Sequence, residues 1–225
     1  PEDDATRRDF TINGLFQNSS NGEIIDYVEG IRDIEAKRLR AIGNPSERFQ
    51  EDALRLMRAI RFATTLKFTI EPATWTAICQ HADLLSQISA ERIRDEFVKT
   101  LMSDNPRTGI TILVDTGLCE KFLPEIPKLR LEIDEHHHHK DVYEHSLTVL
   151  EQAIALEERL GGANLTLRLA ALLHDIGKPK TKALIPGGGV SFHHHEVVGA
   201  KMTKERLRTL RFDNHIVKDV GRLVF

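Results

Sequence analysis

Hydrophobic residues recur every three or four positions along most of the chain after Pro45, a spacing that predicts amphipathic helices. Gly, Pro, Asn and Ser clusters separate these periodic segments and indicate turns between them. We expect helices over the ranges 48–65, 72–80, 90–103, 105–116, 141–160, 165–173, 195–210 and 213–225. The pattern therefore predicts a mainly α body.

The segment before Pro45 follows a different pattern, in which apolar and polar positions alternate on both sides of a polar turn. We expect strands over 10–17 and 23–28, a short helix over 30–37 and a further strand over 39–42. A later hairpin is expected between 180–185 and 190–192. The fold class is therefore mainly α, with a small α/β segment at the start.

Composition limits the possible classes of protein. The chain has 225 residues, of which 40% are hydrophobic, and a formal net charge of −3. This charge argues against a globally basic nucleic-acid binder, so phosphate binding would need a local basic surface. No apolar run is long enough to cross a membrane, and no targeting segment is recognisable at the N-terminus. We expect a cytoplasmic protein with two compact units.

Acidic and basic side chains interleave with apolar ones in EDALRLMRAIRFA, residues 51–63. Arg55, Arg58 and Arg61 form a basic ridge beside the apolar stripe, and Glu51 lies four residues before Arg55. Such a helix can bind an anionic or polar ligand. The alternative is a solvated face with i,i+4 ion pairs, each contributing about 0.2–0.5 kcal/mol.

Histidines are concentrated in the last third of the chain, where all but one of the eleven follow Arg130. Imidazoles combined with a carboxylate favour Mn, Fe, Co, Ni or Zn over Ca. Three segments carry the candidate ligands, namely His145 in YEHSLTVL, His174 and Asp175 in LLHDIGKPK, and His195 in HHHEVVGA. The histidine-rich part therefore predicts a transition-metal site.

These segments resemble the HD phosphohydrolase superfamily, in which a first histidine, a His-Asp pair and a later aspartate hold the metal. The resemblance implies metal ligands at His145, His174 and Asp175, with His195 as an additional ligand and His194 as the second choice. A dinuclear site would activate water for attack on a phosphoester. His193 and the histidines at 136–138 are expected to be surface residues.

The superfamily's last aspartate is expected beyond the end of this sequence. Asp213 and Asp219 are better explained by helix capping and charge pairing. We therefore expect the metal site to be incomplete in this chain.

A second resemblance covers nearly the whole chain. RRDFTING at 7–14, ERFQEDALRLMRAIRFA at 47–63 and ERIRDEF at 91–97 resemble the bacterial class II tRNA nucleotidyltransferases, which comprise CCA-adding enzymes and poly(A) polymerases. Actinobacterial members of that family carry an HD domain. The resemblance implies nucleotide-binding roles for Arg8, Asp9, Asn13, Glu51, Asp52 and Arg55, to which Arg58 is added as a candidate, and supporting roles for Arg7, Glu91, Arg92 and Glu96.

The chemistry of Asp52 and Arg55 is suited to selecting bases. A carboxylate accepts from the exocyclic amine of cytosine or adenine, and a guanidinium donates to the adjacent ring acceptor. Uracil or guanine would present a carbonyl to Asp52, and facing acceptors cost about 1–3 kcal/mol. Contact of Arg58 and Arg61 with triphosphate or RNA, and simple ion pairing, both stay open.

No catalytic residue is assigned in this chain, because the family's carboxylate pair and its Gly-Gly-x-x-Arg-Asp phosphate loop are expected upstream. That pair binds the Mg²⁺ needed for nucleotidyl transfer. We therefore expect a fragment that lacks the N-terminal catalytic segment and the C-terminal end. The expected domains are the palm remnant at 1–43, a helical neck and body at 44–130, and a truncated HD domain at 131–225.

The resemblance implies that the parent protein adds C and A to tRNA 3′ ends from CTP and ATP without a template, and carries a metal-dependent HD domain. The fragment alone is expected to be inactive in this transfer. One alternative is an HD phosphohydrolase, acting on 2′,3′-cyclic phosphates or phosphomonoesters, whose first half is a scaffold. Another is a non-catalytic tRNA-binding subunit of a split enzyme.

Overall fold

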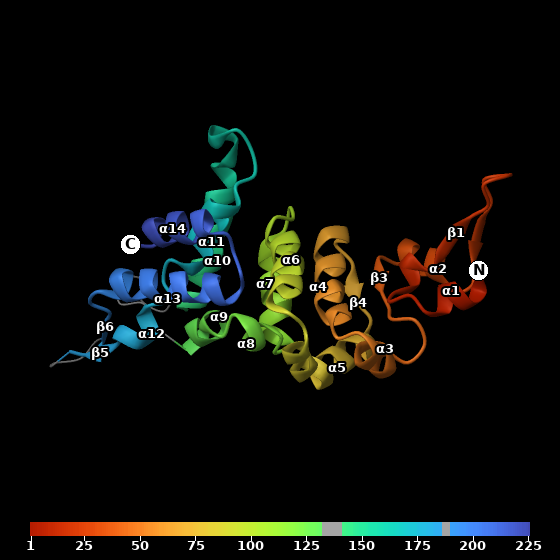
Figure 1. Ribbon diagram of the computed structural model, residues 1–225, viewed down its shortest axis with the longest axis horizontal. Coiled ribbons are helices and arrows are strands. Elements are labelled where there is room, and N and C mark those ends of the chain that lie inside the picture. The colour runs from red at the N-terminus through yellow and green to blue at the C-terminus, as the bar shows by residue number, and fades with distance from the viewer. Residues whose placement is uncertain (132–140, 186–189) are drawn as a thin grey trace. The chain divides into compact units, whose positions relative to one another are not determined.

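The computed structural model describes residues 1–131, 141–185 and 190–225. The chain forms two compact units: unit 1 comprises Pro1–Ser89 and Ser103–Leu118, and unit 2 comprises Ala90–Met102 and Cys119–Phe225. Helices make up most of each unit (Figure 1), which confirms the predicted mainly α class. Among the helices in the described ranges, none is both long and apolar enough to cross a membrane.

Unit 1 begins with short elements joined by tight turns. They are α1 (Glu2–Thr6), the 3₁₀ turn η1 (Thr11–Asn13), the antiparallel pair β1 (Leu15–Gln17) and β2 (Ile24–Asp26), and α2 (Gly30–Glu35). The expected strand over 10–17 is only partly correct, because η1 interrupts it. The Asp9 carboxylate accepts from the backbone N–H of Phe10 and the amide of Asn13, both at 2.9 Å, and so holds this turn.

Two helices, α3 (Pro45–Glu51) and α4 (Leu54–Leu66), replace the expected continuous helix over 48–65. The break falls at Asp52, whose backbone is extended at φ −147° and ψ 102°. Its carboxylate accepts from the N–H of Leu54 at 3.0 Å, an alternative to the helical hydrogen bond that Asp side chains commonly provide. The prediction of one continuous helix was therefore wrong at Asp52, directly after Glu51.

The core of unit 1 lies around α4. Leu56, Met57 and Ile60 are fully buried on its apolar stripe. This stripe packs against α7 (Pro106–Asp115), which contributes Leu113. The remaining elements are β3 (Arg38–Leu39), which pairs in parallel with β4 (Thr69–Ile70), α5 (Pro72–His81) and the 3₁₀ helix η2 (Ala82–Gln87).

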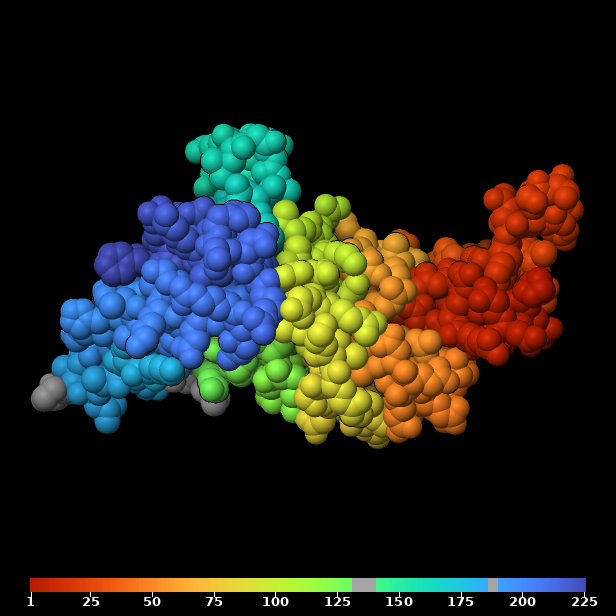
Figure 2. Space-filling model, in the orientation of Figure 1, coloured from red at the N-terminus to blue at the C-terminus, as the bar shows by residue number. Residues whose placement is uncertain are grey.

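Unit 2 is a helical assembly in which α10 (Val142–Ala155) packs on α11 (Leu165–Leu173), and α13 (His195–Thr209) packs on α14 (Asn214–Leu223). The end of α10 and the following 3₁₀ turn η5 (Glu157–Leu160) stand out from the rest of this unit in Figure 2. The smaller elements include α6 (Ala90–Leu101), α8 (Cys119–Phe122), α9 (Glu125–Lys128), η3 (Leu129–Leu131), α12 (Lys178–Thr181), and the antiparallel pair β5 (Ala183–Leu184) and β6 (Val190–Ser191).

A buried ion pair fixes the start of α11 in unit 2. The guanidinium of Arg168 donates to both carboxylate oxygens of Glu157 at 2.7 Å, and also to the carbonyl of Leu101 at 2.8 Å. These bonds join α6, η5 and α11. The helix that carries the His-Asp pair at its C-terminal end is thereby held at its other end.

Candidate nucleotide and metal sites

Asp9 is the centre of the first candidate site and is 7% exposed. Its Oδ2 accepts from Nε of Arg58 on α4 at 2.6 Å, while its Oδ1 accepts from Nδ2 of Asn13 at 2.9 Å. The sequence left the role of Arg58 open between contact with triphosphate or RNA and simple ion pairing. The structure pairs it with Asp9, a residue that lies 49 positions earlier.

Arg55 joins α4 to the N-terminal segment. Its Nη1 donates to Oε2 of Glu51 at 2.8 Å and to the carbonyl of Arg48 at 3.1 Å, and its Nη2 donates to the carbonyl of Arg7 at 3.1 Å. A guanidinium has five N–H donors. Its Nε–H and one Nη2–H therefore make no hydrogen bond within the described part of the chain, and both remain available to a ligand.

Arg8 and Arg7 lie at the edge of the same site and are exposed. Arg8 donates to Asp4 and to the carbonyl of Asn13, both at 3.0 Å, and its guanidinium lies 5.0 Å from the ring centre of Phe16. Arg7 contributes its backbone carbonyl to Arg55. The structure thus gathers the predicted nucleotide residues of unit 1 along α1, η1 and the α3–α4 junction.

The expected supporting residues Glu91, Arg92 and Glu96 lie on α6 in unit 2. Glu96 is buried and accepts from Lys99 at 3.0 Å, while Glu91 and Arg92 are exposed. Their expected support of the base-reading segment stays a prediction.

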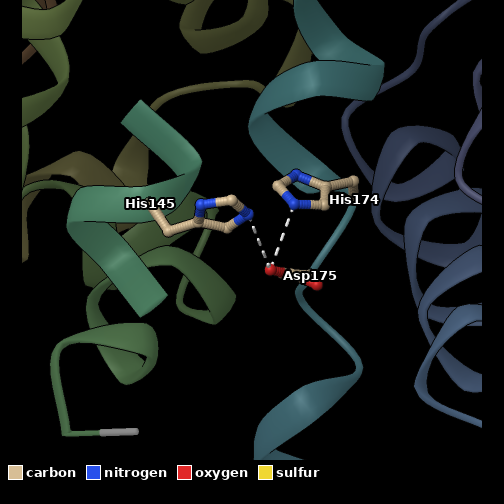
Figure 3. A group of neighbouring side chains, drawn as sticks. All are labelled: His145, His174 and Asp175. Atoms are coloured by element: carbon tan, nitrogen blue, oxygen red, sulfur yellow. Dashed lines mark ion pairs between the residues drawn. The ribbon is translucent and has the colours of Figure 1, made fainter. Parts of the chain in front are cut away.

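The second candidate site lies in unit 2, where His145 of α10 meets His174 and Asp175 at the end of α11 (Figure 3). One potential ligand atom from each residue falls within 4.8 Å of the others. Asp175 Oδ2 lies 3.0 Å from Nε2 of His174 and 3.8 Å from Nε2 of His145. The two imidazole rings are 5.2 Å apart between centres.

Backbone carbonyls orient two of the imidazoles. Nδ1 of His174 lies 2.8 Å from the carbonyl of Ala171, and Nδ1 of His195 lies 2.9 Å from the carbonyl of Phe192. A proton on each Nδ1 leaves the Nε2 lone pair directed at Asp175, the usual arrangement for metal-binding histidines. His195 Nε2 lies 3.5 Å from Oδ1 of Asp175, on the carboxylate oxygen opposite to His145 and His174.

Asp175 is 2% exposed, and its Oδ2 makes no hydrogen bond of good geometry with the described residues. Burial raises the pKa of this carboxyl, but the charges of His174 and Lys178 outweigh burial and lower its pKa to about 2. Lys178 Nζ, which the sequence analysis did not single out, lies 3.0 Å from the same oxygen. A buried carboxylate oxygen without a hydrogen bond, facing imidazole lone pairs, fits a divalent cation.

Gly177 permits the close approach of α12 and α13 at this site. A Cβ atom at position 177 would collide with the carbonyl oxygen of His195 and lie 2.7 Å from the nitrogen of Gly199.

The other candidate ligands of the sequence analysis lie outside this cluster. The second-choice ligand His194 is exposed, and its Nδ1 lies 3.9 Å from Oε1 of Glu196. Asp213 and Asp219 are also exposed, and Asp213 makes no side-chain cap, contrary to the capping expectation. The histidines at 136–139 lie outside the described residues.

Three family models match consecutive parts of the chain. The poly A polymerase head domain matches residues 1–40, the probable RNA and SrmB-binding site of polymerase A matches 67–129, and the HD domain matches 142–225. Together they define a nucleotidyltransferase-type chain that continues into an HD domain. Domains of these two types imply dependence on divalent metal ions.

The chain is also similar to characterised proteins. It is 39% identical over 99% of its length to an A-adding tRNA nucleotidyltransferase of Deinococcus radiodurans, of which it spans 51%. It is 50% identical over 55% of its length to a CCA-adding enzyme of Lactococcus lactis, covering 31% of that protein. The Bacillus stearothermophilus CCA-adding enzyme crystallised with CTP matches 98% of the chain at 28% identity and a TM-score of 0.61, over 45% of that enzyme.

This chain belongs to the class II family of tRNA nucleotidyltransferases and poly(A) polymerases. It spans about half the length of its Deinococcus relative.

Proposed function

We propose that this chain is the base-reading and RNA-binding part of a cytoplasmic tRNA nucleotidyltransferase that adds C and A to tRNA 3′ ends from ATP and CTP. The relatives named as A-adding and CCA-adding enzymes support this class of reaction. Magnesium would serve the transfer through carboxylates outside the present sequence. Within the chain, Asp52 and Arg55 select the base, and Asp9, Asn13 and Arg58 hold the turn that bears Arg8.

The hydrogen bonding of Arg55 supports the proposal best. Three donors fix the guanidinium to Glu51 and to the carbonyls of Arg48 and Arg7. The two remaining donors are therefore presented in a fixed orientation. Such pre-organised donors discriminate between bases more strongly than a mobile side chain, because less conformational entropy is lost on binding.

Equilibrium binding of the four ribonucleoside triphosphates to this chain tests the proposal. Wild type should bind CTP and ATP more tightly than UTP and GTP, and Arg55→Ala should remove at least about 1.5 kcal/mol of this preference. The matched control is Arg32→Ala, because Arg32 is an exposed arginine of α2 paired with Glu29 at 3.8 Å. Equal binding of all four triphosphates by the wild-type chain would exclude base reading by this segment.

We further propose that the HD cluster holds a transition metal, Mn, Ni, Co or Zn, through His145, His174, Asp175 and His195. When bound, such an ion supplies a Lewis acid and an activated water for phosphoester hydrolysis. The chain's residues provide oriented imidazoles and a buried carboxylate, and Lys178 places a positive charge beside them. A phosphohydrolase activity appended to the transferase is thus the second candidate function, and the convergence of His145, His174 and His195 on the buried carboxylate of Asp175 supports it.

A further inference from the structure

A stripe of cations follows one side of α13. Lys201, Lys204, Arg208 and Arg211 are spaced by three, four and three residues, with Arg211 just past the end of the helix. This spacing keeps Lys201, Lys204 and Arg208 on one side of the helix, because helical residues three and four apart are neighbours. Arg211 follows the helix in a left-handed backbone conformation at φ 59°. At about 1.5 Å of rise per residue the stripe is roughly 15 Å long. Glu205 is the one acidic residue on this side, four residues after Lys201 and three before Arg208, so the cations outnumber it by four to one.

Most of these cations lack counter-ions. Within the described ranges, Lys201, Lys204 and Arg208 make no ion pair or side-chain hydrogen bond, and Arg211 has only a 3.9 Å contact with Glu91. Arg206, which lies on another side of the same helix, is bound to Glu125 at 2.8 Å. Glu125 therefore neutralises Arg206, which lies outside the stripe, whereas the cations of the stripe keep their positive charge.

Helix α14 extends this basic face. A Cβ atom at Gly221 would collide with the side chain of Lys204, lying 2.6 Å from its Cγ, so the stem of Lys204 crosses directly over α14 at this glycine. Lys218 and Arg222, both exposed, flank the crossing point along the chain. Residues 201–222 contain seven basic and three acidic residues, in a chain whose net charge is −3. In Figure 2, α13 and α14 form a continuous surface of unit 2.

We propose that this α13–α14 face, defined by Lys201, Lys204, Arg208, Arg211, Lys218 and Arg222, binds the phosphate backbone of RNA. The inference rests on the proposed function for the identity of the nucleic acid. It concerns a surface outside residues 67–129, where the RNA-binding family model matches.

The composition of the stripe favours RNA over a lipid surface. A helix that adsorbs to a membrane carries large apolar residues beside its cations. The exposed residues between Lys201 and Arg211, apart from the cations, are Glu205 and Thr209. Val197 precedes the stripe, and Leu223 and Phe225 follow Arg222 at the end of α14, but no large apolar side chain is exposed between Lys201 and Arg211. This row of cations matches a row of phosphates, each contact releasing a counter-ion.

The test measures binding of a tRNA transcript without its 3′ CCA to this chain by fluorescence anisotropy over a salt series. The double variant Lys201→Glu/Arg208→Glu should weaken binding at least tenfold at about 100 mM salt, and should lower the slope of log K against log salt by about 1.4–1.8. Lys180→Glu/Arg159→Glu makes the same charge change at exposed positions of unit 2 outside residues 67–129 and should change neither quantity appreciably. Lys201→Gln/Arg208→Gln repeats the test without charge reversal if the first variant fails to fold.

Equal loss in the control pair would overturn the proposal, because net charge would then explain binding. An unchanged salt slope in both stripe variants would overturn it as well, as would tighter binding to vesicles of phosphatidylglycerol and phosphatidylcholine than to the transcript. CTP binding, measured in parallel, should be unaffected by the stripe variants. If the wild-type chain shows no preference for CTP and ATP, the proposed function is contradicted. If it shows this preference but does not bind the transcript, only the proposed RNA-binding surface is contradicted.

Discussion

Asp9 in unit 1 and Asp175 in unit 2 are both buried carboxylates beside cations, but their partners differ in kind. Asp9 is bound by the guanidinium of Arg58, the amide of Asn13 and a backbone N–H, all with hydrogen-bond geometry. Asp175 faces imidazoles and an ammonium at ion-pair distances, and its Oδ2 has no hydrogen bond among the described residues. The first site is a closed network that fixes a turn, and the second can exchange its partners for a metal.

The largest expected effect is on metal binding at the second site. Asp175→Asn removes the anionic ligand between the imidazoles and should lower Mn²⁺ affinity by at least about 100-fold, as measured by calorimetry and electron paramagnetic resonance. Asp219→Asn, at an exposed carboxylate of the same unit, should leave the affinity unchanged. Comparable loss in both variants would mean that Mn²⁺ binds elsewhere.

Disruption of the hydrogen-bond network around Asp9 should lower the stability of the fold. Asp9→Ala leaves Arg58 and Asn13 without their common acceptor and should lower the free energy of unfolding by about 1–3 kcal/mol in urea denaturation. Asp4→Ala removes the exposed partner of Arg8 and should cost less than about 0.5 kcal/mol. Equal costs would show that burial does not distinguish these two carboxylates.

The two sites should also differ in their response to pH. Burial lowers the pKa of His174, but the carboxylate of Asp175, 3.0 Å from its Nε2, outweighs burial, so the net pKa is raised above 6.5. Metal binding requires the neutral imidazole, so Mn²⁺ affinity should rise about tenfold per pH unit below this pKa and level off above it. In the metal-free chain the same shift stabilises the fold at low pH, and that contribution is lost as pH rises through the raised pKa. A flat affinity profile between pH 6 and 8 would contradict this.

The smallest effect is expected at the exposed rim of the first site. Glu51 is 48% exposed and pairs with Arg48 and Arg55. Glu51→Gln should change the free energy of unfolding by less than about 1 kcal/mol, since Arg55 keeps its bonds to two backbone carbonyls. A loss above about 2 kcal/mol would show that the rim belongs to the closed network.

Sequence periodicity was sufficient to place the buried stripe of α4, because Met57, Ile60 and Ala63 repeat at helical spacing. The motif around His174 likewise identified residues that the structure brings together. Two features could not be predicted. The break at Asp52 depends on a side chain competing for a backbone N–H, and the pairing of Asp9 with Arg58 joins positions 49 residues apart. Lys178 was missed because its approach to Asp175 depends on the turn between α11 and α12.

Assembly of the candidate metal cluster also depends on Gly177, a residue that supplies no ligand atom. A methyl group there would push the start of α13 away from the end of α11, and His195 would move with it. A related chain could thus retain all four candidate ligands and still fail to assemble them. When such clusters are compared between proteins, the absence of a side chain at this position is as informative as the presence of the histidines.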